Sequence, residues 1–512
     1  MRKDTSRPPF RRILIANRGE IAVRIARTCR EMGIESVAVH SDVDATAMHA
    51  LVADRAEPIG ARAPSASYLN VDAIIAAARR SKADAVHPGY GFLSENAAFA
   101  RAVEDAGLVW IGPPPATQAA LGDKLRARRS AAEAGVPIVP GMLVPLDAAS
   151  AADATGIGFP LMLKAAAGGG GRGMRRVERQ ADLASAVEGA QREAHAAFGD
   201  GTLYAERLVA PARHIEVQLL GDRHGNLAVL GERDCSVQRR HQKLVEESPS
   251  PAVTPAIREA LFESARRVAG TVAFHNAATV EFLLDAQANH YFLEMNTRLQ
   301  VEHGVTELVT GLDLVAWQIR VAAGERLPGE VLGVEPRGHA VEVRLYAEDP
   351  WHGFHPVGGH VSTWRLPQGP GVRVDGAVIP GLELTPEYDP LLAKLLVRAE
   401  SRPAMVNRLR RALDETLIGG LQTDLGFHRW LVDQPEFVSG DYDTTLIEQR
   451  WKDGPEPDET VLGLAALAVV EARTAADRAR SQGVAPGAGP SAGDRPWARA
   501  GRQAALRGGD GG

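Results

Sequence analysis

Residues 294–302 combine side chains of the types that could carry out chemistry. They read Glu294-Met295-Asn296-Thr297-Arg298-Leu299-Gln300-Val301-Glu302, so every even position is polar. Successive side chains of an extended chain alternate between faces, which predicts one face lined by all five polar groups. Carboxylate and amide oxygens suit Mg²⁺, and a guanidinium can bind a small planar anion through paired donors. A solvated strand face would show the same alternation, so the pattern alone leaves both interpretations open.

A second carboxylate-bearing strand is predicted beside this segment. Residues 279–284 and 290–296 flank a polar turn, which is typical of a β-hairpin. The hairpin places Glu281 on the strand that pairs with the one carrying Glu294 and Asn296. Together these three side chains form a credible site for a Mg²⁺-bound nucleotide.

Lysine is scarce, and three lysines lie close to these motifs. Only seven of the 58 basic residues are lysine, as a coding bias toward arginine would also produce. An isolated lysine is usually a solvated surface charge. Lys124, Lys164 and Lys243 taken together, however, offer compact cations that can offset the charge of a polyphosphate. With the two carboxylate strands, they favour ATP held between two β-layers.

A glycine-rich turn follows Lys164. Residues 161–164 and 174–177 are predicted strands, and the segment between them contains Gly168–Gly171 and Gly173. A phosphate-binding P-loop would open a helix and end in Lys followed by Ser or Thr, which this segment does not. It is either a lid whose amides face phosphates or simply a mobile surface hairpin, and the glycines alone do not decide.

The elements that must position these groups begin with alternating strands and helices. Strands are predicted at 13–16, 36–40, 83–87 and 109–111, with a helix from 21 to 32 ended by Gly33, a helix at 71–78, and a helix capped by Ser94 that ends near 107. This order implies a parallel sheet covered by helices on both faces. The turn after the first strand reads Asn17-Arg18-Gly19-Glu20 and lacks the G-x-G-x-x-G pattern of dinucleotide-binding folds. We therefore exclude a dinucleotide-binding fold here.

The middle and last parts of the chain read differently. A strand is predicted at 214–219, a turn at 221–226, a helix that starts at Thr254-Pro255 and ends at Gly270, and a helix over 312–323. The region from 338 to 450 is rich in strand patterns. An Ala-rich helix is expected over 459–480, followed by a disordered Gly-, Ala-, Pro- and Arg-rich tail.

Composition narrows the class of protein. The 512 residues suggest roughly three domains, and 45% hydrophobic with 24% charged residues is ordinary globular composition. Two cysteines exclude a disulfide scaffold. The longest apolar run, 461–470, is half of what a membrane span needs, and no signal peptide is evident. A net charge of −6 gives no footprint for nucleic acid. We expect a cytoplasmic, multi-domain protein that binds neither nucleic acid nor membrane, and composition does not indicate its chemistry.

Five stretches together are similar to the ATP-grasp biotin carboxylases: 15–22, 87–96, 164–174, 232–243 and 294–303. The resemblance covers about residues 10–450 and extends to the biotin carboxylase part of acetyl-, propionyl- and methylcrotonyl-CoA carboxylase alpha subunits. It implies an α/β fold with an N-terminal parallel-sheet, nucleotide-binding-like domain, an ATP-grasp domain and a C-terminal β-rich domain. The expected boundaries are an extension over 1–12, domains over 13–127, 128–325 and 326–452, and a tail over 453–512.

The resemblance also implies a role for each site residue. Expected ATP contacts are Lys124, Lys164, Gly168, Gly169, Gly170, Gly171, Glu206, His214, Gln238, His241, Glu281 and Glu294. Two Mg²⁺ or Mn²⁺ ions are expected on Glu281, Glu294 and Asn296. Bicarbonate is expected to contact Lys243, Arg298, Gln300, the Val301 backbone and Glu302. Glu302 resembles the catalytic base and Arg344 the biotin-binding residue that stabilises the biotin enolate, with Arg298 and Lys243 also catalytic. Asp389 is expected to be structural.

The implied reaction is the carboxylation of biotin by ATP and bicarbonate through carboxyphosphate, the first half-reaction of an acyl-CoA carboxylase. No Met precedes a Lys, so biotin is expected on a carrier protein in trans, with a carboxyltransferase subunit as a second partner. A homodimer is also implied, with Arg24 at its contact. Gly304 stands where the family usually has Pro. The alternatives are an ATP-grasp ligase with another acceptor, such as a carbamoyl-phosphate or purine ligase, and a non-catalytic scaffold.

Overall fold

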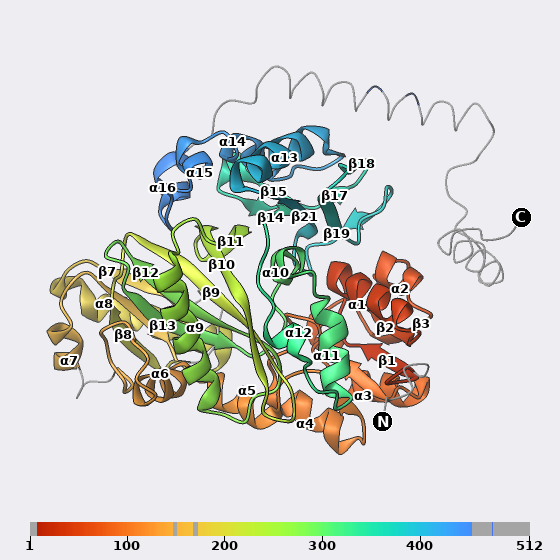
Figure 1. Ribbon diagram of the computed structural model, residues 1–512, viewed down its shortest axis with the longest axis horizontal. Helices are drawn as coiled ribbons and strands as arrows, with labels where there is room; N and C mark the ends of the chain where they lie inside the picture. Colours follow the sequence, from red (N-terminus) through yellow and green to blue (C-terminus); the bar gives the residue numbers. More distant parts are fainter. Residues whose placement is uncertain (1–7, 147–150, 167–172, 453–469, 471–473, 475–512) are drawn as a thin grey trace, which may run out of the picture.

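The chain folds around one large antiparallel sheet, with a parallel sheet on one side and a small three-stranded sheet on the other (Figure 1). The computed structural model describes residues 8–146, 151–166 and 173–452, together with residues 470 and 474. The predicted glycine turn at 168–171 and nearly all of the helix predicted over 459–480 lie outside the described residues. Within the described part of the chain, no helix is long and apolar enough to cross a membrane.

The N-terminal sheet is parallel, as predicted, with the strand order β3-β2-β1-β4-β5. Its strands are β1 (Arg12–Ile15), β2 (Glu35–Ser41), β3 (Arg55–Gly60), β4 (Ala85–His87) and β5 (Val109–Trp110). All four residues of β1 are buried, as expected for a central strand covered on both faces. Strand β3 was not predicted from the sequence, because it is an edge strand that contains Pro58 and exposed residues.

Helices alternate with the strands of this sheet and continue after the last of them. These are α1 (Gly19–Glu31), α2 (Met48–Val52), α3 (Val71–Ser81), α4 (Ala97–Asp105), α5 (Pro115–Leu121) and α6 (Lys124–Glu133), with the short 3₁₀ turn η1 (Pro64–Ala66). Gly33 follows α1 with φ +70°, which confirms the predicted C-terminal glycine. The cap predicted at Ser94 is wrong. Asn96 caps α4 instead, because its side chain accepts the Phe99 amide at 2.9 Å.

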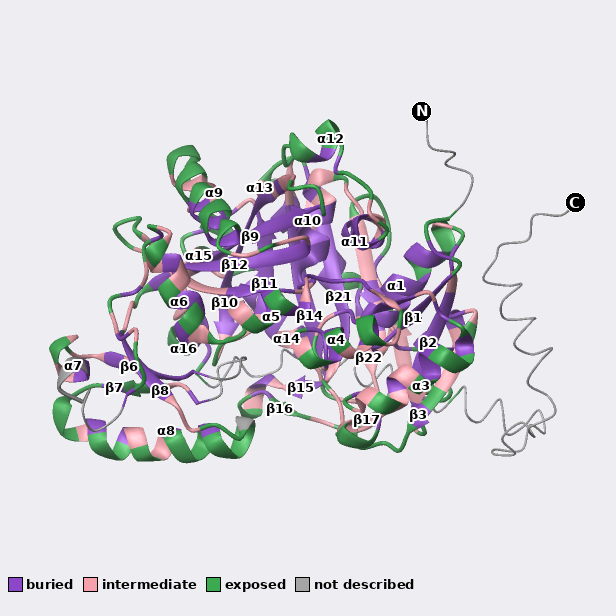
Figure 2. Ribbon diagram, turned by 90° about the horizontal axis from the view of Figure 1, so that it is seen from below, coloured by how far each residue is buried: buried purple, intermediate pink, exposed green. Residues whose placement is uncertain are grey.

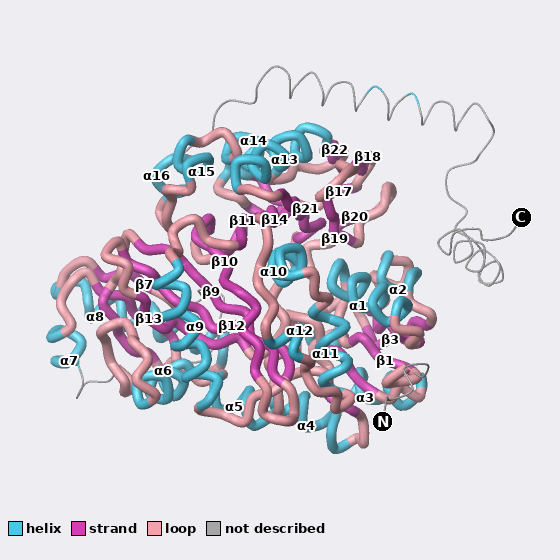
Figure 3. The backbone as a smooth tube through the Cα atoms, viewed as in Figure 1, coloured by secondary structure: helices cyan, strands magenta, loops and turns pink. Residues whose placement is uncertain are grey.

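The central sheet has eight strands in the order β13-β12-β9-β10-β11-β14-β21-β19. They are β9 (Ala212–Gly221), β10 (Leu227–Arg239), β11 (Gln242–Ser248), β12 (Asn276–Asp285), β13 (His290–Asn296), β14 (His339–Tyr346), β19 (Val372–Gly376) and β21 (Leu391–Ala399). The predicted hairpin of β12 and β13 is confirmed, with Glu281 opposite Glu294. Helix α9 (Pro255–Gly270) covers one face and packs Leu261 and Val268 against β9 (Figure 3). It has the predicted bounds and begins at the predicted cap, Thr254.

The central sheet continues across the boundary expected near residue 326. Strand β14 pairs with β11, so that Val343 lies opposite Val245. One apolar core combines these two valines with Leu395 on β21 and reaches as far as Trp451. The β-rich C-terminal region therefore extends the sheet of the preceding region through β14, β21 and β19, and adds three two-stranded sheets of its own. Figure 2 shows this shared sheet as the most buried part of the molecule.

The small sheet, in the order β7-β6-β8, lies at one end of the molecule. Its strands are β6 (Leu161–Ala165), β7 (Arg175–Val177) and β8 (Leu203–Arg207), accompanied by α7 (Ala151–Gly156), α8 (Leu183–Phe198) and η2 (Gln180–Asp182). Strands β6 and β7 are antiparallel neighbours, as predicted for the two strands that flank the glycine turn. Lys164 on β6 and Glu206 on β8 are thereby placed in one sheet.

Short elements complete the chain. Helices α10 (His303–Thr310), α11 (Leu314–Ala322) and α12 (Gly329–Leu332) connect the central sheet to the N-terminal region. The C-terminal region adds β15 (Glu348–Asp349), η3 (Pro350–His352), β16 (His355–Pro356), β17 (Gly359–His360), β18 (Thr363–Arg365), β20 (Glu383–Leu384), α13 (Arg402–Glu415), β22 (Leu417–Gly419), α14 (Leu425–Leu431), α15 (Pro435–Ser439) and α16 (Leu446–Arg450). Helix α11 begins at Asp313, whose side chain accepts the Ala316 amide at 2.7 Å.

Arg24 ties the N-terminal region to the helices beside the central sheet. It is buried on α1 and donates to Glu307 at 2.8 Å and to Asp313 at 2.9 Å, in addition to a hydrogen bond to Thr28. The contacts of its guanidinium are therefore made within its own chain. The dimer contact that the resemblance implies for Arg24 stays a prediction.

We expect Arg24→Met to destabilise the protein by about 1–3 kcal/mol, because it removes one of the two cations of the buried Glu307 carboxylate, and Arg373 remains at 2.7 Å. The shift of the urea unfolding midpoint measures the effect. Arg79→Met, which removes an exposed arginine from α3, is the control and should change stability by less than about 0.5 kcal/mol. Equal midpoints for the two variants would show that the Arg24 contacts do not hold the regions together.

Candidate active site

Lys243 lies at the centre of the candidate site. From β11 its ammonium contacts Glu216 on β9 at 2.6 Å, Glu281 on β12 at 3.0 Å and Glu302 at 2.7 Å. The three carboxylate side chains are at most 6% exposed. Burial opposes the ionisation of Glu302, but Lys243 and Arg344 outweigh it and hold the pKa of Glu302 well below its ordinary value. The base predicted from sequence is thus ionised at neutral pH.

Glu302 is held from a second side by Arg344. The Arg344 guanidinium on β14 donates to Glu302 at 3.0 Å and to Glu246 at 2.7 Å. All three side chains are buried. Glu302 stands at the N-terminal end of α10, so a short loop and a helix start present the carboxylate between the two cations. The structure therefore brings together the predicted base, Lys243 and Arg344.

The predicted extended segment ends earlier than expected. Strand β13 stops at Asn296, and residues 297–302 form a loop. The alternating pattern thus predicted correctly which side chains gather, but not that they remain on one strand. Arg298 nevertheless reaches Gln300 at 2.8 Å and Asn296 at 3.3 Å. The loop brings these groups together because its polar side chains contact one another directly.

Glu95 from the N-terminal region holds this loop. It accepts from the Arg298 guanidinium at 2.9 Å and from the Thr297 amide at 3.0 Å. Burial opposes the charge of Arg298, and Glu95 outweighs this and raises the pKa of Arg298. Glu95 lies in one of the stretches that carried the resemblance, yet no role was predicted for it. The contact couples the N-terminal region to Arg298, the residue predicted to bind bicarbonate.

The predicted metal ligands lie on one face of the β12–β13 hairpin. Asn296 donates to Glu281 at 2.9 Å, whereas Glu294 pairs with Lys124 at 3.0 Å. His214 on β9 contacts the other oxygen of Glu281 at 2.8 Å. Burial opposes the ionisation of Glu281, and Lys243 and His214 outweigh it to lower the pKa of Glu281 well below its ordinary value. Carboxylate and amide oxygens beside lysines fit a divalent cation bound together with a polyphosphate.

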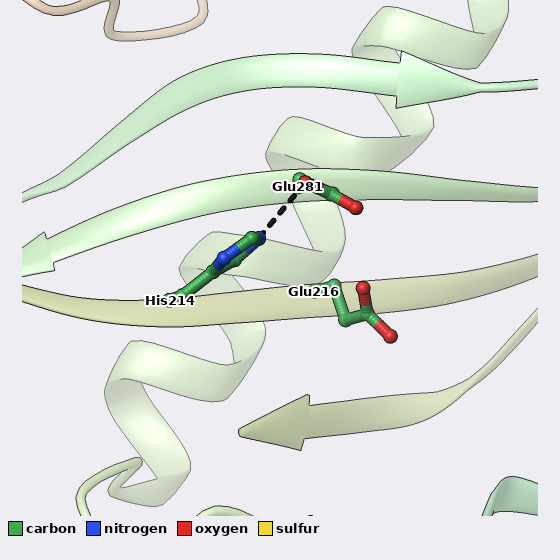
Figure 4. A group of neighbouring side chains, drawn as sticks. All are labelled: His214, Glu216 and Glu281. Atoms are coloured by element: carbon green, nitrogen blue, oxygen red, sulfur yellow. Dashed lines mark hydrogen bonds and ion pairs between the residues drawn. The ribbon is translucent and has the colours of Figure 1, made fainter. Parts of the chain in front are cut away.

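A second group of possible ligands has a different explanation. The side chains of His214, Glu216 and Glu281 converge within reach of a single ion (Figure 4). The ammonium of Lys243 already contacts both carboxylates of this group. The buried charge is therefore compensated by the protein itself, so these three side chains alone give no reason to add a metal there.

The remaining predicted nucleotide residues approach from two sides. Lys164 on the small sheet contacts Glu206 at 2.5 Å, and Glu206 also accepts from Arg128. His241 lies at the turn between β10 and β11, where burial and the charge of Lys164 lower the pKa of His241. Gln238 is buried near the end of β10. Lys164 on the small sheet and Lys124 on α6 thus both act on His241, and Gly168–Gly171 lie outside the described residues.

Sequence reasoning missed several charged residues of the site. Glu216 lies two residues after His214 on the predicted strand 214–219, so strand alternation was a usable signal for it. Arg233 is fully buried and bonds Glu216 and Gln218, the latter at 2.8 Å. Glu246 gave no signal, because its partner Arg344 is 98 residues away in sequence.

Carboxylates, lysines and arginines gather on one antiparallel sheet, and a second antiparallel sheet contributes Lys164 and Glu206, an arrangement expected of a ligase of the ATP-grasp class. Family models match the chain in three consecutive parts: the biotin carboxylase N-terminal domain at 9–117, the ATP-binding domain of the carbamoyl-phosphate synthase L chain at 123–330, and the biotin carboxylase C-terminal domain at 342–449. A biotin carboxylase from Nostoc sp. is 49% identical over 445 residues, covering 86% of this chain and 100% of the relative. The chain belongs to the biotin carboxylase family.

Other relatives agree. The propionyl-CoA carboxylase alpha chain of Ruegeria pomeroyi is 45% identical over 488 residues, covering 90% of this chain and 72% of the relative. A solved complex of a biotin carboxylase with β-γ-ATP from Campylobacter jejuni superposes with a TM-score of 0.84 at 44% identity, covering 86% of this chain and 99% of that one. The biotin carboxylase domain dimer of Hydrogenobacter thermophilus 2-oxoglutarate carboxylase was solved with MgADP, ADP and bicarbonate. It superposes with a TM-score of 0.84 at 44% identity, covering 86% of this chain and 97% of that one.

Glu246 gives a prediction about pH. Burial raises the pKa of Glu246 from 4.5 to about 7, although Arg344 opposes the shift. A carboxyl with a raised folded-state pKa stabilises the fold at low pH and loses that contribution as pH rises from about 4.5 to 7. The loss is about 1.4 kcal/mol per pH unit. We therefore expect the melting temperature of Glu246→Gln, relative to wild type, to increase between pH 5 and pH 7 and then level off.

The control for this series is Glu104→Gln, which changes an exposed glutamate on α4. Its melting temperature relative to wild type should stay constant between pH 5 and pH 8. A flat profile for Glu246→Gln as well would contradict the raised pKa of Glu246.

Proposed function

We propose that this chain carboxylates biotin on a separate carrier protein, using ATP and bicarbonate through a carboxyphosphate intermediate. The observation that carries the proposal is the position of the Glu302 carboxylate between Lys243 and Arg344, beside the loop that bears Arg298 and Gln300. One base therefore stands next to an anion-binding guanidinium and to a second guanidinium aimed at the acceptor. Family membership supports the same reaction.

The first step activates bicarbonate. Arg298, Lys243, Gln300 and the Val301 backbone bind the anion, and Glu302 accepts its proton. An oxygen of bicarbonate then attacks the γ-phosphorus of ATP, and ADP leaves. A carboxylate held by two cations is a weak base. Glu302 becomes a better base when the anion takes over part of its contacts with Lys243, since each lost cation contact raises the pKa of a carboxyl group.

The second step transfers the carboxyl group. Carboxyphosphate breaks down to CO₂ and phosphate, the phosphate takes the N1 proton of biotin, and N1 attacks CO₂. Arg344 stabilises the negative oxygen of the biotin enolate. A buried guanidinium suits this role because it stays cationic and presents paired donors to an oxyanion. Glu246 fixes the direction of that guanidinium at 2.7 Å.

The nucleotide lies, in this proposal, between the small sheet and the central sheet. Its expected contacts are Lys124, Lys164, Glu206, His214, Gln238 and His241, with Gly168–Gly171 as the lid. Glu281, Glu294 and Asn296 would hold Mg²⁺ or Mn²⁺, which supplies positive charge to the phosphates of the bound nucleotide. Lys124 pairs with Glu294 at 3.0 Å, so the protein itself already offsets the charge of this carboxylate.

The site favours biotin over other acceptors of ATP-grasp ligases. A carbamoyl-phosphate or purine ligase has no need for Arg344 and Lys243 around the same carboxylate. The family models flanking the ATP-binding part are those of biotin carboxylase. A non-catalytic scaffold would not need to keep buried charges such as Glu302, which stabilise a fold less than apolar residues of similar volume.

Partners follow from the reaction. We propose a biotin carboxyl carrier protein and a carboxyltransferase subunit as partners, because relatives are named as subunits of larger carboxylases. A homodimer is supported by the dimeric biotin carboxylase domain from Hydrogenobacter thermophilus. We also propose the division into regions at 13–127, 128–325 and 326–452, of which the last two share one sheet, with the tail beyond, and a cytoplasmic location.

ADP formation by the purified chain tests the proposed function. ATP and Mg²⁺ are supplied first alone, and then with bicarbonate and free biotin added singly and together. ADP formation that requires bicarbonate and rises with biotin is the expected result. ATP binding without bicarbonate-dependent turnover, even with a biotinylated carrier present, would overturn the assignment.

Glu302→Gln should lower bicarbonate-dependent ADP formation by about 10²- to 10⁴-fold, because the variant keeps the shape of the side chain but cannot accept the proton. ATP binding, measured by calorimetry, should persist because Glu302 lies outside the proposed nucleotide contacts. Glu104→Gln serves again as an exposed control and should retain wild-type turnover. Wild-type turnover in Glu302→Gln would show that another group is the base.

A further inference from the structure

Lys394 is a lysine at the site to which the reaction described above gives no role. It lies on β21, and its side chain is 0% exposed. Lysine is almost never fully buried unless its charge is paired, because removing an ammonium from water is costly. The chain has only seven lysines, and this one occupies a position where its ammonium must be paired within the protein.

The ammonium of Lys394 joins three parts of the protein. It donates to the backbone carbonyl of Val301 at 2.7 Å, contacts Glu20 on α1 at 3.1 Å and lies 3.9 Å from Asp375 on β19. Glu20 in turn accepts from the Tyr90 hydroxyl. Asp375 is compensated more closely by Arg373, at 2.6 Å. The shortest contact of Lys394 is therefore the one to the loop formed by residues 297–302, which carries Glu302.

The register of the central sheet places Lys394 beside Arg344. Lys394 on β21 pairs directly with Arg344 on β14, so the two side chains leave the same face of the sheet. Arg344 reaches the Glu302 carboxylate, and Lys394 reaches the carbonyl of the preceding residue, Val301. Two neighbouring cations of one sheet thus hold consecutive residues of the loop that carries the base.

We propose that Lys394 is a positioning residue that fixes the peptide between Val301 and Glu302 and thereby sets the place of the base at the bicarbonate site. The proposal rests on the proposed function. A peptide group is planar, so anchoring the Val301 carbonyl fixes the Cα of Glu302 as well. It also keeps a carbonyl oxygen, which would repel bicarbonate, bound to a cation. Through Glu20, the position of the loop depends on the packing of α1.

Lys394→Met tests the proposal, since methionine is similar in length and lacks the ammonium. We expect kcat/KM for bicarbonate in ADP formation to fall about 10- to 100-fold, the effect of one charge-assisted hydrogen bond in the transition state. KM for ATP should change by less than about twofold, because the described hydrogen bond and ion pairs of Lys394 are with Val301, Glu20 and Asp375, none of which is a proposed nucleotide residue. Amides of residues 297–304 should exchange hydrogen faster.

Two further variants separate positioning from stability. Glu20→Gln combined with Lys394→Met removes the carboxylate that loses its cation, so this double variant should regain melting temperature but not kcat/KM for bicarbonate. Arg402→Met breaks the buried contact of Arg402 with Glu247 at 2.8 Å, away from the loop. It should lower the melting temperature while leaving KM for bicarbonate and the exchange of residues 297–304 unchanged.

Each outcome decides one proposal. If wild type forms ADP with bicarbonate but Lys394→Met or the double variant keeps wild-type kcat/KM for bicarbonate, the positioning role is wrong. Proportional losses in the kinetics for ATP and bicarbonate, with unchanged loop exchange, would also overturn it, because that pattern indicates general destabilisation. If the wild type itself forms no ADP with bicarbonate and biotin, the proposed function is wrong and the role of Lys394 in it falls too.

Discussion

The ammonium of Lys243 balances three buried carboxylates, and the arrangement of the site depends on that balance. Glu216, Glu281 and Glu302 come from β9, β12 and the loop before α10, and they would repel one another in a low-dielectric interior without a shared cation. Because the partners are on different elements, the balance also fixes how those elements are placed. A residue suited to chemistry is in this way also a structural one, and the loop that carries the base cannot move independently of the sheet.

The antiparallel sheet supplies the other charges in pairs. Glu281 lies opposite Glu294, Glu246 opposite Glu342, and Arg344 opposite Lys394. Like charges directly opposite one another are unfavourable, so each pair needs opposite charge from a neighbouring strand or loop. Glu342 shows the cost most clearly. Neither of its carboxylate oxygens has a hydrogen-bond partner among the described residues, and burial, with the charge of Glu246 adding to it, raises the pKa of Glu342 well above its ordinary value despite Lys394.

Local patterns predicted much of the fold and of the site. The β12–β13 hairpin, the cap at Thr254 and the glycine after α1 were readable because each depends on neighbours in sequence. The groups around Glu302 were readable partly from alternation and partly from resemblance. What could not be predicted depends on partners distant in sequence. The end of β13 at Asn296 is an example, because the loop that follows is held by Glu95, about 200 residues earlier. Glu246 and Lys394 are further examples.

The pairing of β11 with β14 has a consequence for how the chain can be divided. A fragment that ends before residue 326 would leave the edge of β11 without its neighbour, and the complementary fragment would expose β14 along with the apolar side chains of Val343 and Leu395. Open, apolar strand edges recruit strands from other molecules. Recombinant pieces cut at that point would therefore aggregate or re-pair, whereas a cut after the N-terminal parallel sheet severs no strand ladder. The regions on the two sides of residue 326 are in this sense one folding unit.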